Sequence, residues 1–231
     1  MSENSKISAK VKRILLFSIF IIPTILCFAF YIFMIRKPFL ENPSGLYKTL
    51  AYFGSKPLAA NGDTIYKTIP DFSFLNQNGD EITHKNYEGK IFVASFICTQ
   101  CADTCPKIAA QFFRMQKKVN YIKGLSVVSF SVNPEQDSVP ALRKYARMVH
   151  ANPDYWNFLS SNRNDLLNIA KAGFEIKNLQ DSILPHQDQI YLIDKSRHIR
   201  GIYEGKSTTD INRLIDEIKV LDAEYRVAKR K

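Results

Sequence analysis

Residues 91–107 read IFVASFICTQCADTCPK, and this stretch decides the fold. Its first seven residues are almost all apolar, which is typical of a strand that is covered on both faces. Three cysteines follow within eight positions, and Pro106 then stands where the first turn of a helix tolerates proline. The pattern predicts a buried strand over 91–97 that passes through a cysteine-bearing turn into a helix.

The segment after this turn has the spacing of an amphipathic helix. Apolar residues recur at intervals of four and three positions, at Ile108, Phe112, Met115, Val119 and Ile122. Further along we expect a buried strand over 125–132, helices over 139–150, 165–172 and 209–221, and a terminal hairpin formed by 189–194 and 199–203. Strands joined by helical crossovers run parallel, so the sheet should be parallel with an antiparallel edge.

Another hairpin is predicted ahead of the first buried strand. The Asn78-Gly79 step separates residues 68–75 from 81–84, and Asn-Gly is a strong signal for a tight hairpin turn. The complete order of elements predicts an α/β, thioredoxin-like fold with an N-terminal β-hairpin.

The amino-terminal region contains a long apolar run. Residues 14–35 (Ile14 to Ile35) lack any charge, and a helix of this length spans a hydrocarbon core of about 30 Å. The run is longer than the apolar core of a cleaved signal peptide, so we predict one transmembrane anchor. More Lys and Arg precede the run than follow it, which places residues 1–13 in the cytoplasm as a short tail and the rest outside.

The rest of the chain divides by composition. Residues 36–66 are rich in proline and glycine and suit a linker, 67–221 should form the domain, and 222–231 form a basic tail. The net charge of +10 lies mainly in these flanks and in the amino-terminal tail. We therefore expect no nucleic-acid partner, because the basic flanks are explained by topology and anionic headgroups.

The clustered cysteines, Cys98, Cys101 and Cys105, admit four kinds of site. A structural disulfide would add little, since the entropy gain from a cross-link grows with loop length. Structural zinc usually takes two separated ligand pairs, although Cys98, Cys101, Cys105 and a histidine could supply four ligands. A thioredoxin-type oxidoreductase wants C-x-x-C, whereas Cys101 and Cys105 form C-x-x-x-C. Copper is the fourth alternative.

The expected position of Cys101 and Cys105 in the fold favours reactive thiols. We expect them at the carboxyl end of the first buried strand and at the start of a helix, where ligands gather in open α/β sheets. The amino end of a helix favours thiolate, so the pKa of these cysteines should be lowered. His186 stands just ahead of the strand over 189–194. Two thiolates and one imidazole form a ligand set that suits copper.

Three motifs follow one another along the domain: FICTQCADTCPK at 96–107, SVNPEQD at 131–137 and LPHQDQIYLID at 184–194. Together they resemble the Sco/SenC family of membrane-anchored copper-binding proteins. The likeness covers roughly residues 67–221, and the amino-terminal anchor fits the family plan. Its specificity lies in the combination of C-x-x-x-C-P, a downstream histidine and the tether.

The resemblance implies a copper chaperone that acts in assembly of the binuclear copper centre of cytochrome c oxidase. Its copper ligands would be Cys101, Cys105 and His186, and the partner would be the copper-receiving subunit of the oxidase. The implied location is the bacterial cytoplasmic (inner) membrane, with a single pass and the domain facing the periplasm. Such a protein is not a turnover enzyme.

The alternative is a membrane-anchored thiol-disulfide reductase that keeps the cysteines of a partner reduced. Cys101 and Cys105 would then be a catalytic redox dithiol, and a thiol-disulfide reductant would restore them. A peroxidase of the peroxiredoxin type is disfavoured, because Cys105 and His186 would have no role in it.

This chain departs from the family pattern at three positions, with Ala102, Asn133 and Pro185 where proline, aspartate and aspartate are usual. None of these changes removes a ligand, but losing the aspartates could alter partner docking or the basicity of His186. Asp103 is retained and is expected to cap the helix.

Cys98 occupies a position where the family tends to have an aromatic residue. One interpretation is a buried thiol that packs as a small hydrophobe. The other is an auxiliary thiol that pairs with Cys101 and makes a C-x-x-C, which would favour disulfide exchange.

Overall fold

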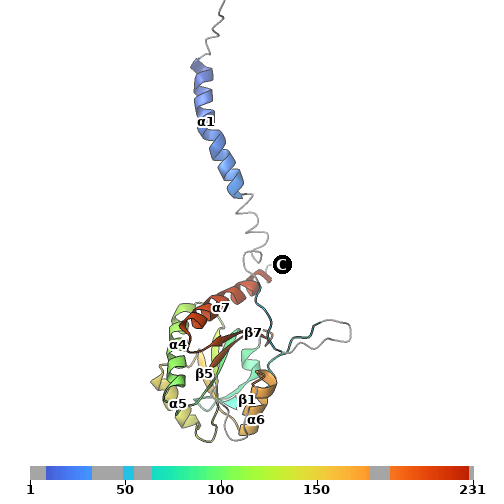
Figure 1. The fold of residues 1–231 in the computed structure, drawn as a ribbon, viewed down its shortest axis with the longest axis vertical. Helices are drawn as coiled ribbons and strands as arrows, with labels where there is room; N and C mark the ends of the chain where they lie inside the picture. Colours follow the sequence, from blue (N-terminus) through green and yellow to red (C-terminus); the bar gives the residue numbers. More distant parts are fainter. Residues whose placement is uncertain (1–8, 33–48, 55–63, 177–187, 229–231) are drawn as a thin grey trace, which may run out of the picture. The chain divides into compact units, whose positions relative to one another are not determined.

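The structure is a computed structural model that describes residues 9–32, 49–54, 64–176 and 188–228 (Figure 1). The chain forms two compact units, residues 1–48 and 49–231. The first unit contains helix α1 (Ala9–Phe30). Within the described ranges, no helix combines the length and the apolar character that crossing a bilayer requires.

The second unit is built on a five-stranded sheet. Its strands are β3 (Phe92–Ile97), β4 (Ser126–Ser131), β5 (Trp156–Leu159), β6 (Gln189–Ile193) and β7 (Ile199–Glu204). They lie in the order β5-β4-β3-β6-β7, with β3, β4 and β5 parallel and β6 antiparallel to both neighbours. The predicted parallel sheet with an antiparallel edge is confirmed.

The helices and the small hairpin surround this sheet. They are α4 (Thr104–Val119), α5 (Val139–Met148), α6 (Arg163–Asn168) with a π-helical turn (Ile169–Gly173), α7 (Thr208–Ala228), and strands β1 (Ser73–Leu75) and β2 (Glu81–Thr83) with a 3-10 turn (His84–Tyr87). β1 and β2 pair antiparallel, and Gly79 between them has a φ of 89°, as a tight turn requires. The predicted hairpin is therefore present.

Strand β3 is buried along its whole length because its two faces enter two separate cores. Val93 and Ile97 point into one core, and Phe92, Ala94 and Phe96 point into the other. This period of two is the reason that β3 reads as a continuous apolar run in the sequence.

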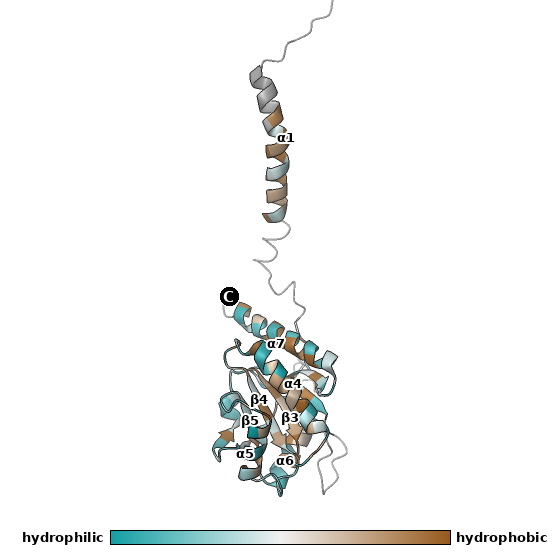
Figure 2. Ribbon diagram, turned by 90° about the vertical axis from the view of Figure 1, so that its left-hand side faces the viewer, coloured by the Kyte–Doolittle hydropathy of each residue, from teal (hydrophilic) through white to brown (hydrophobic). Residues whose placement is uncertain are grey.

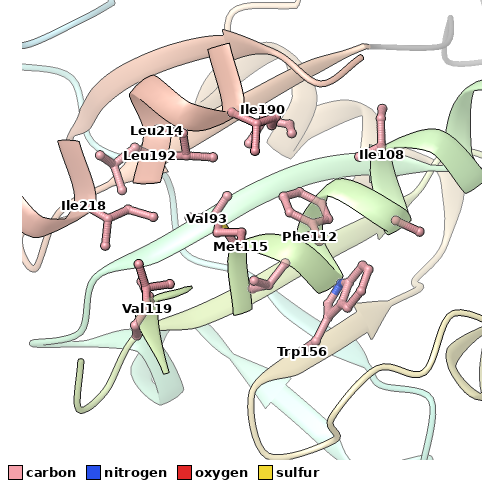
Figure 3. Close-up of a cluster of buried hydrophobic side chains, with 14 of the residues drawn as sticks. Val93, Ile108, Phe112, Met115, Val119, Trp156, Ile190, Leu192, Leu214 and Ile218 are labelled. Carbon is pink, nitrogen blue, oxygen red and sulfur yellow. The ribbon is translucent and has the colours of Figure 1, made fainter. Parts of the chain in front are cut away.

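Helix α4 covers the first face of the sheet together with α7. Its apolar row, Ile108, Phe112, Met115 and Val119, belongs to one core cluster with side chains of the sheet and of α7 (Figure 3). Figure 2 shows hydrophilic and hydrophobic turns mixed along both helices, as expected of amphipathic helices with one covered side. The predicted spacing is confirmed as far as Val119, whereas Ile122 lies beyond the end of the helix, in the turn before β4.

The second face is covered by aromatic rings and by the segment around α6. Phe130 of β4 makes ring contacts with Phe72, Phe74, Phe96 and Phe174 at centroid distances of 5.6 to 5.9 Å. The hairpin region supplies Phe72 and Phe74, so the hairpin closes this core.

Residues 49–54 pack on the domain, although composition had placed them in a linker. The buried guanidinium of Arg200 donates to the carbonyl of Leu50 at 2.8 Å and lies 4.2 Å from the ring centroid of Tyr52. The amide of Leu50 donates to Glu224 at 2.8 Å. The compact unit thus begins at Thr49, earlier than the expected Lys67.

Two other boundaries differ from expectation. Helix α7 continues past 221 to Ala228, because Glu224 contacts Arg200 and Tyr225 lies under Lys195. Strand β5 was not predicted. It is only four residues long, and pairing with β4 defines it more than any periodic pattern does.

Candidate functional site

The three clustered cysteines lie at the carboxyl end of β3 and the start of α4. Cys98 directly follows β3, Cys101 lies in the turn, and Cys105 is the second residue of α4. The amide of Cys101 donates to the carbonyl of Cys98 at 3.4 Å and closes the turn. The expected placement of Cys101 and Cys105 at a strand-to-helix junction is therefore observed.

Two of the three sulfurs are bonded to each other. Cys98 and Cys101 form a disulfide with a Cα–Cα separation of 5.5 Å, whereas Cys105 is a free thiol with 2% of its surface exposed. The interpretation of Cys98 as a free, packed thiol is wrong, and its pairing with Cys101 is confirmed. The amide of Cys98 also donates to the sulfur of Cys105 at 3.3 Å, so all three residues meet in one turn.

A buried carboxylate lies against this turn. Asp137 has no exposed surface and accepts hydrogen bonds from the amide of Thr99 at 3.3 Å and from the hydroxyl of Thr99. The hydroxyl of Ser131 donates to its other oxygen at 2.6 Å. Among the described residues no cation pairs with Asp137, so its charge is balanced by hydrogen bonds alone.

Burial raises the pKa of the Cys105 thiol. The hydrogen bond from the Cys98 amide opposes this effect, while the negative charges of Asp137 and Asp188 add to it. The lowered pKa that we expected from the helix amino end is wrong for Cys105, because the loss of water around a fully covered sulfur outweighs the helix dipole. Cys105 is therefore a protonated thiol at neutral pH.

Charged side chains form the outer edge of the site. Asp103 is at the N-cap position of α4, but its carboxylate makes no capping hydrogen bond and instead pairs with Lys107 at 2.5 Å. The prediction that Asp103 caps the helix is wrong, because this ion pair takes the carboxylate. Asp188, just ahead of β6, pairs with Lys206 after β7 and raises the pKa of that lysine.

The proposed third ligand, His186, lies outside the described residues, as does Pro185. Asp188, two positions further on, is described, and its charge acts on Cys105. Within the described part of the chain, no group of three or more His, Cys, Asp or Glu side chains is arranged to hold a metal ion.

Comparison with known families decides which group of proteins this chain represents. The SCO1/SenC family model matches residues 61–221, which is most of the chain. The chain belongs to the SCO1/SenC family. The predicted thioredoxin-like architecture is accordingly that of solved Sco structures.

Three relatives illustrate the family. A SCO1 protein homolog of Bacillus subtilis is 28% identical over 68% of this chain and 84% of its own length. The structure of BsSco, a Sco-family cytochrome c oxidase assembly protein with a disulfide switch, is 27% identical, covers 68% of this chain and 94% of that one, and has a TM-score of 0.59. Copper-bound ScoI of Arabidopsis thaliana is 22% identical, covers 68% and 98%, and has a TM-score of 0.56.

Asp137 is the residue that sequence reasoning missed in this SCO1/SenC domain. Its motif, SVNPEQD, carried the resemblance, but the last aspartate was given no role. An acidic residue directly after a buried strand, at the sheet edge where the cysteines also end, was the available signal. Only the fold shows that it contacts Thr99 inside the cysteine turn.

Proposed function

We propose that this SCO1/SenC protein binds copper through Cys101, Cys105 and His186 and serves assembly of the binuclear copper centre of cytochrome c oxidase, with the copper-receiving subunit of the oxidase as partner. The observation that carries the proposal is the placement of Cys101 and Cys105 on one strand-to-helix turn of a family member. Copper is cargo in this proposal.

The position of His186 in the sequence supports its inclusion. His186 stands two positions before Asp188. Asp188 is close enough to Cys105 for its charge to affect the pKa of that thiol. The nearness of His186 to Asp188 in the sequence therefore supports its inclusion in the proposed ligand set.

The donor set fits copper after one chemical step. Thiolates and an imidazole suit Cu(I), and the imidazole also accommodates Cu(II). The Cys98–Cys101 disulfide withholds one of the two sulfurs, so copper binding requires its prior reduction. A thiol-disulfide reductant is therefore the second partner that we propose.

The proposed location is the bacterial cytoplasmic membrane, with residues 14–35 as a single-pass anchor and the domain facing the periplasm. The uncharged run of these residues and the excess of Lys and Arg before it support this topology. An oxidising compartment also suits a protein with a disulfide next to its site.

Titration with Cu(I) in competition with a chromogenic chelator tests the ligand set. The full chain in detergent, reduced with a phosphine, should bind one copper ion. His186→Ala and Cys105→Ser should each weaken binding by at least about tenfold. His150→Asn is the matched control, because His150 is exposed and Asn tolerates its φ of 52°. Unchanged affinity in His186→Ala would remove that residue from the site.

A second function, thiol-disulfide reduction of a partner, is favoured by one observation. Cys98 and Cys101 form a C-x-x-C disulfide in the turn that precedes α4, and C-x-x-C is the motif of thioredoxin-like oxidoreductases. The reduced protein should then reduce a disulfide-bearing peptide without copper, and a variant that lacks the resolving thiol should accumulate a mixed disulfide. Absence of both under conditions where copper binds would exclude this function.

A further inference from the structure

Three cysteines share a turn that needs only two for the proposed copper site. Cys98 supplies the third sulfur, and it is bonded to Cys101. Cys105 is left as a thiol, and the amide of Cys98 contacts its sulfur at 3.3 Å. A thiol next to a disulfide in one short turn is the arrangement in which thiol-disulfide exchange takes place.

The two outer cysteines are held by regular structure. The residue before Cys98, Ile97, accepts a hydrogen bond from the amide of Val132 at 2.7 Å at the end of the β3–β4 ladder. Cys105 belongs to the first turn of α4 and is buried in the core under that helix. Neither position moves without disturbing the sheet or the helix.

Cys101 lies between these two fixed positions. It belongs to neither β3 nor α4, and its neighbours Ala102 and Asp103 are exposed. On the Cys98 side, the turn is held at Thr99 by Asp137, whereas Cys101 itself is tied to Cys98 by one long backbone hydrogen bond of 3.4 Å that the shift would break. The sulfur of Cys101 can therefore approach either outer cysteine.

We propose that Cys101 exchanges its disulfide partner between Cys98 and Cys105. Cys105 loses its proton to solvent, and its thiolate attacks the sulfur of Cys101. The Cys101–Cys105 bond forms as the Cys98–Cys101 bond breaks, and Cys98 leaves as a thiolate that takes up a proton. One disulfide and one thiol are present before and after, so the step needs no oxidant or reductant.

The exchange controls which thiol remains in the oxidised protein. With Cys98 and Cys101 paired, the free thiol is Cys105, which is buried and shielded from further oxidation. The disulfide is only half-buried, so a dithiol reductant can reach it from solvent. Reduction then yields both sulfurs of the proposed copper pair. This consequence rests on the proposed function, whereas the exchange itself is measured without metal.

Thiol labelling of the full chain in detergent tests the exchange. Cys27→Ala removes the exposed cysteine of α1, so every disulfide within the chain belongs to the cluster. The protein is oxidised with glutathione disulfide, and its free thiols are pulse-labelled with N-ethylmaleimide either within seconds or after an hour. Fragment ions in mass spectrometry then show which cysteine carries the label.

The proposal predicts that both Cys98 and Cys105 carry label. The ratio of label on Cys98 to label on Cys105 should reach the same value at both time points. In the same background, Cys98→Ser should form only Cys101–Cys105, and Cys105→Ser only Cys98–Cys101. Cys101→Ser should form a disulfide at least about tenfold more slowly, because the shared sulfur is missing.

The proposal is overturned if only one cysteine of the cluster carries label at both times in the Cys27→Ala protein. It is also overturned if Cys101→Ser forms a disulfide as fast as the Cys27→Ala protein does. The labelling of the Cys27→Ala protein decides the matter even where a cluster variant fails to fold. Loss of copper binding with the exchange intact would overturn the proposed function alone.

Discussion

Asp137 accepts hydrogen bonds from both the amide and the hydroxyl of Thr99, and this pair joins the turn after β4 to the cysteine turn after β3. Thr99 lies between Cys98 and Cys101, so the buried carboxylate holds the backbone of the cysteine cluster. The two turns come from strands that are neighbours in the sheet, which explains how residues 38 positions apart meet.

Replacing Asp137 with Ala should destabilise the domain. The amide of Thr99 and the hydroxyl of Ser131 would lose their buried acceptor, which costs about 1–3 kcal/mol. Urea unfolding followed by the fluorescence of Trp156, the single tryptophan, measures the free energy of unfolding.

Substitutions at Thr99 separate the contributions to this contact. Thr99→Ser retains the hydroxyl and should unfold close to the unsubstituted protein, whereas Thr99→Val removes the hydroxyl donor and should be less stable. Equal stability of Asp137→Ala and the unsubstituted protein would show that the carboxylate does not hold the turn.

The alkylation rate of Cys105 should rise at a higher pH than that of an ordinary cysteine. Burial raises its pKa, so the midpoint of the iodoacetamide rate, measured at Cys105 by mass spectrometry, should lie above pH ~8.5. Asp137→Asn should lower this midpoint, since the charge of Asp137 contributes to the raised pKa. A midpoint at or below the ordinary value would contradict the burial of this thiol.

The same shift sets a stability trend. The pKa of Cys105 is higher in the folded protein than in the unfolded chain. The contribution of Cys105 to the free energy of unfolding is therefore fully present below the unfolded pKa and is lost as the pH rises through the folded pKa. Above pH ~8.5, Cys105→Ser should therefore lose less stability than the parent chain as the pH rises. Unfolding experiments in steps of ~0.5 pH unit measure this difference.

Arg200→Met should be strongly destabilising. Arg200 is 4% exposed and donates to Asp194 at 3.1 Å, to Glu224 at 3.1 Å and to the carbonyl of Leu50. Its loss removes the arginine that pairs with the buried Asp194 carboxylate, which retains hydrogen bonds from the amides of Ser196 and His198, at a cost of about 3–5 kcal/mol.

The exposed ion pair of Arg163 with Glu135 is the matched control for Arg200. Arg163→Met should change the unfolding midpoint little, because solvent screens a surface pair. Similar effects of the two substitutions would contradict a special role for the buried cation. Protease cleavage near residues 49–54 should increase in Arg200→Met and not in Arg163→Met, because Arg200 donates to the carbonyls of Leu50 and Ala51.

Gly205→Ala should displace the segment around Asp188, which leads into β6. A Cβ at this position would lie 2.8 Å from the carbonyl oxygen of Asp188 and 2.9 Å from a side-chain carbon of Ile108. Overpacking of this kind costs about 1–3 kcal/mol. Under the proposed ligand set, displacement of Asp188 should also weaken Cu(I) binding, and unchanged stability together with unchanged affinity would contradict both expectations.

Local patterns in the sequence determined the order of elements apart from β5, the hairpin turn at Gly79 and the position of the cysteines between β3 and α4. Each of these features depends on residues within a few positions of one another, such as the apolar run of β3 and the three-and-four spacing of α4. The motifs also identified the family correctly.

Tertiary contacts alone decided that Cys98 pairs with Cys101, that Asp137 holds Thr99, and that the pKa of Cys105 is raised. They also brought residues 49–54 onto Arg200. Desolvation and hydrogen bonding depend on neighbours that are distant in the chain, and no local spacing encodes how deeply a sulfur or a carboxylate is covered.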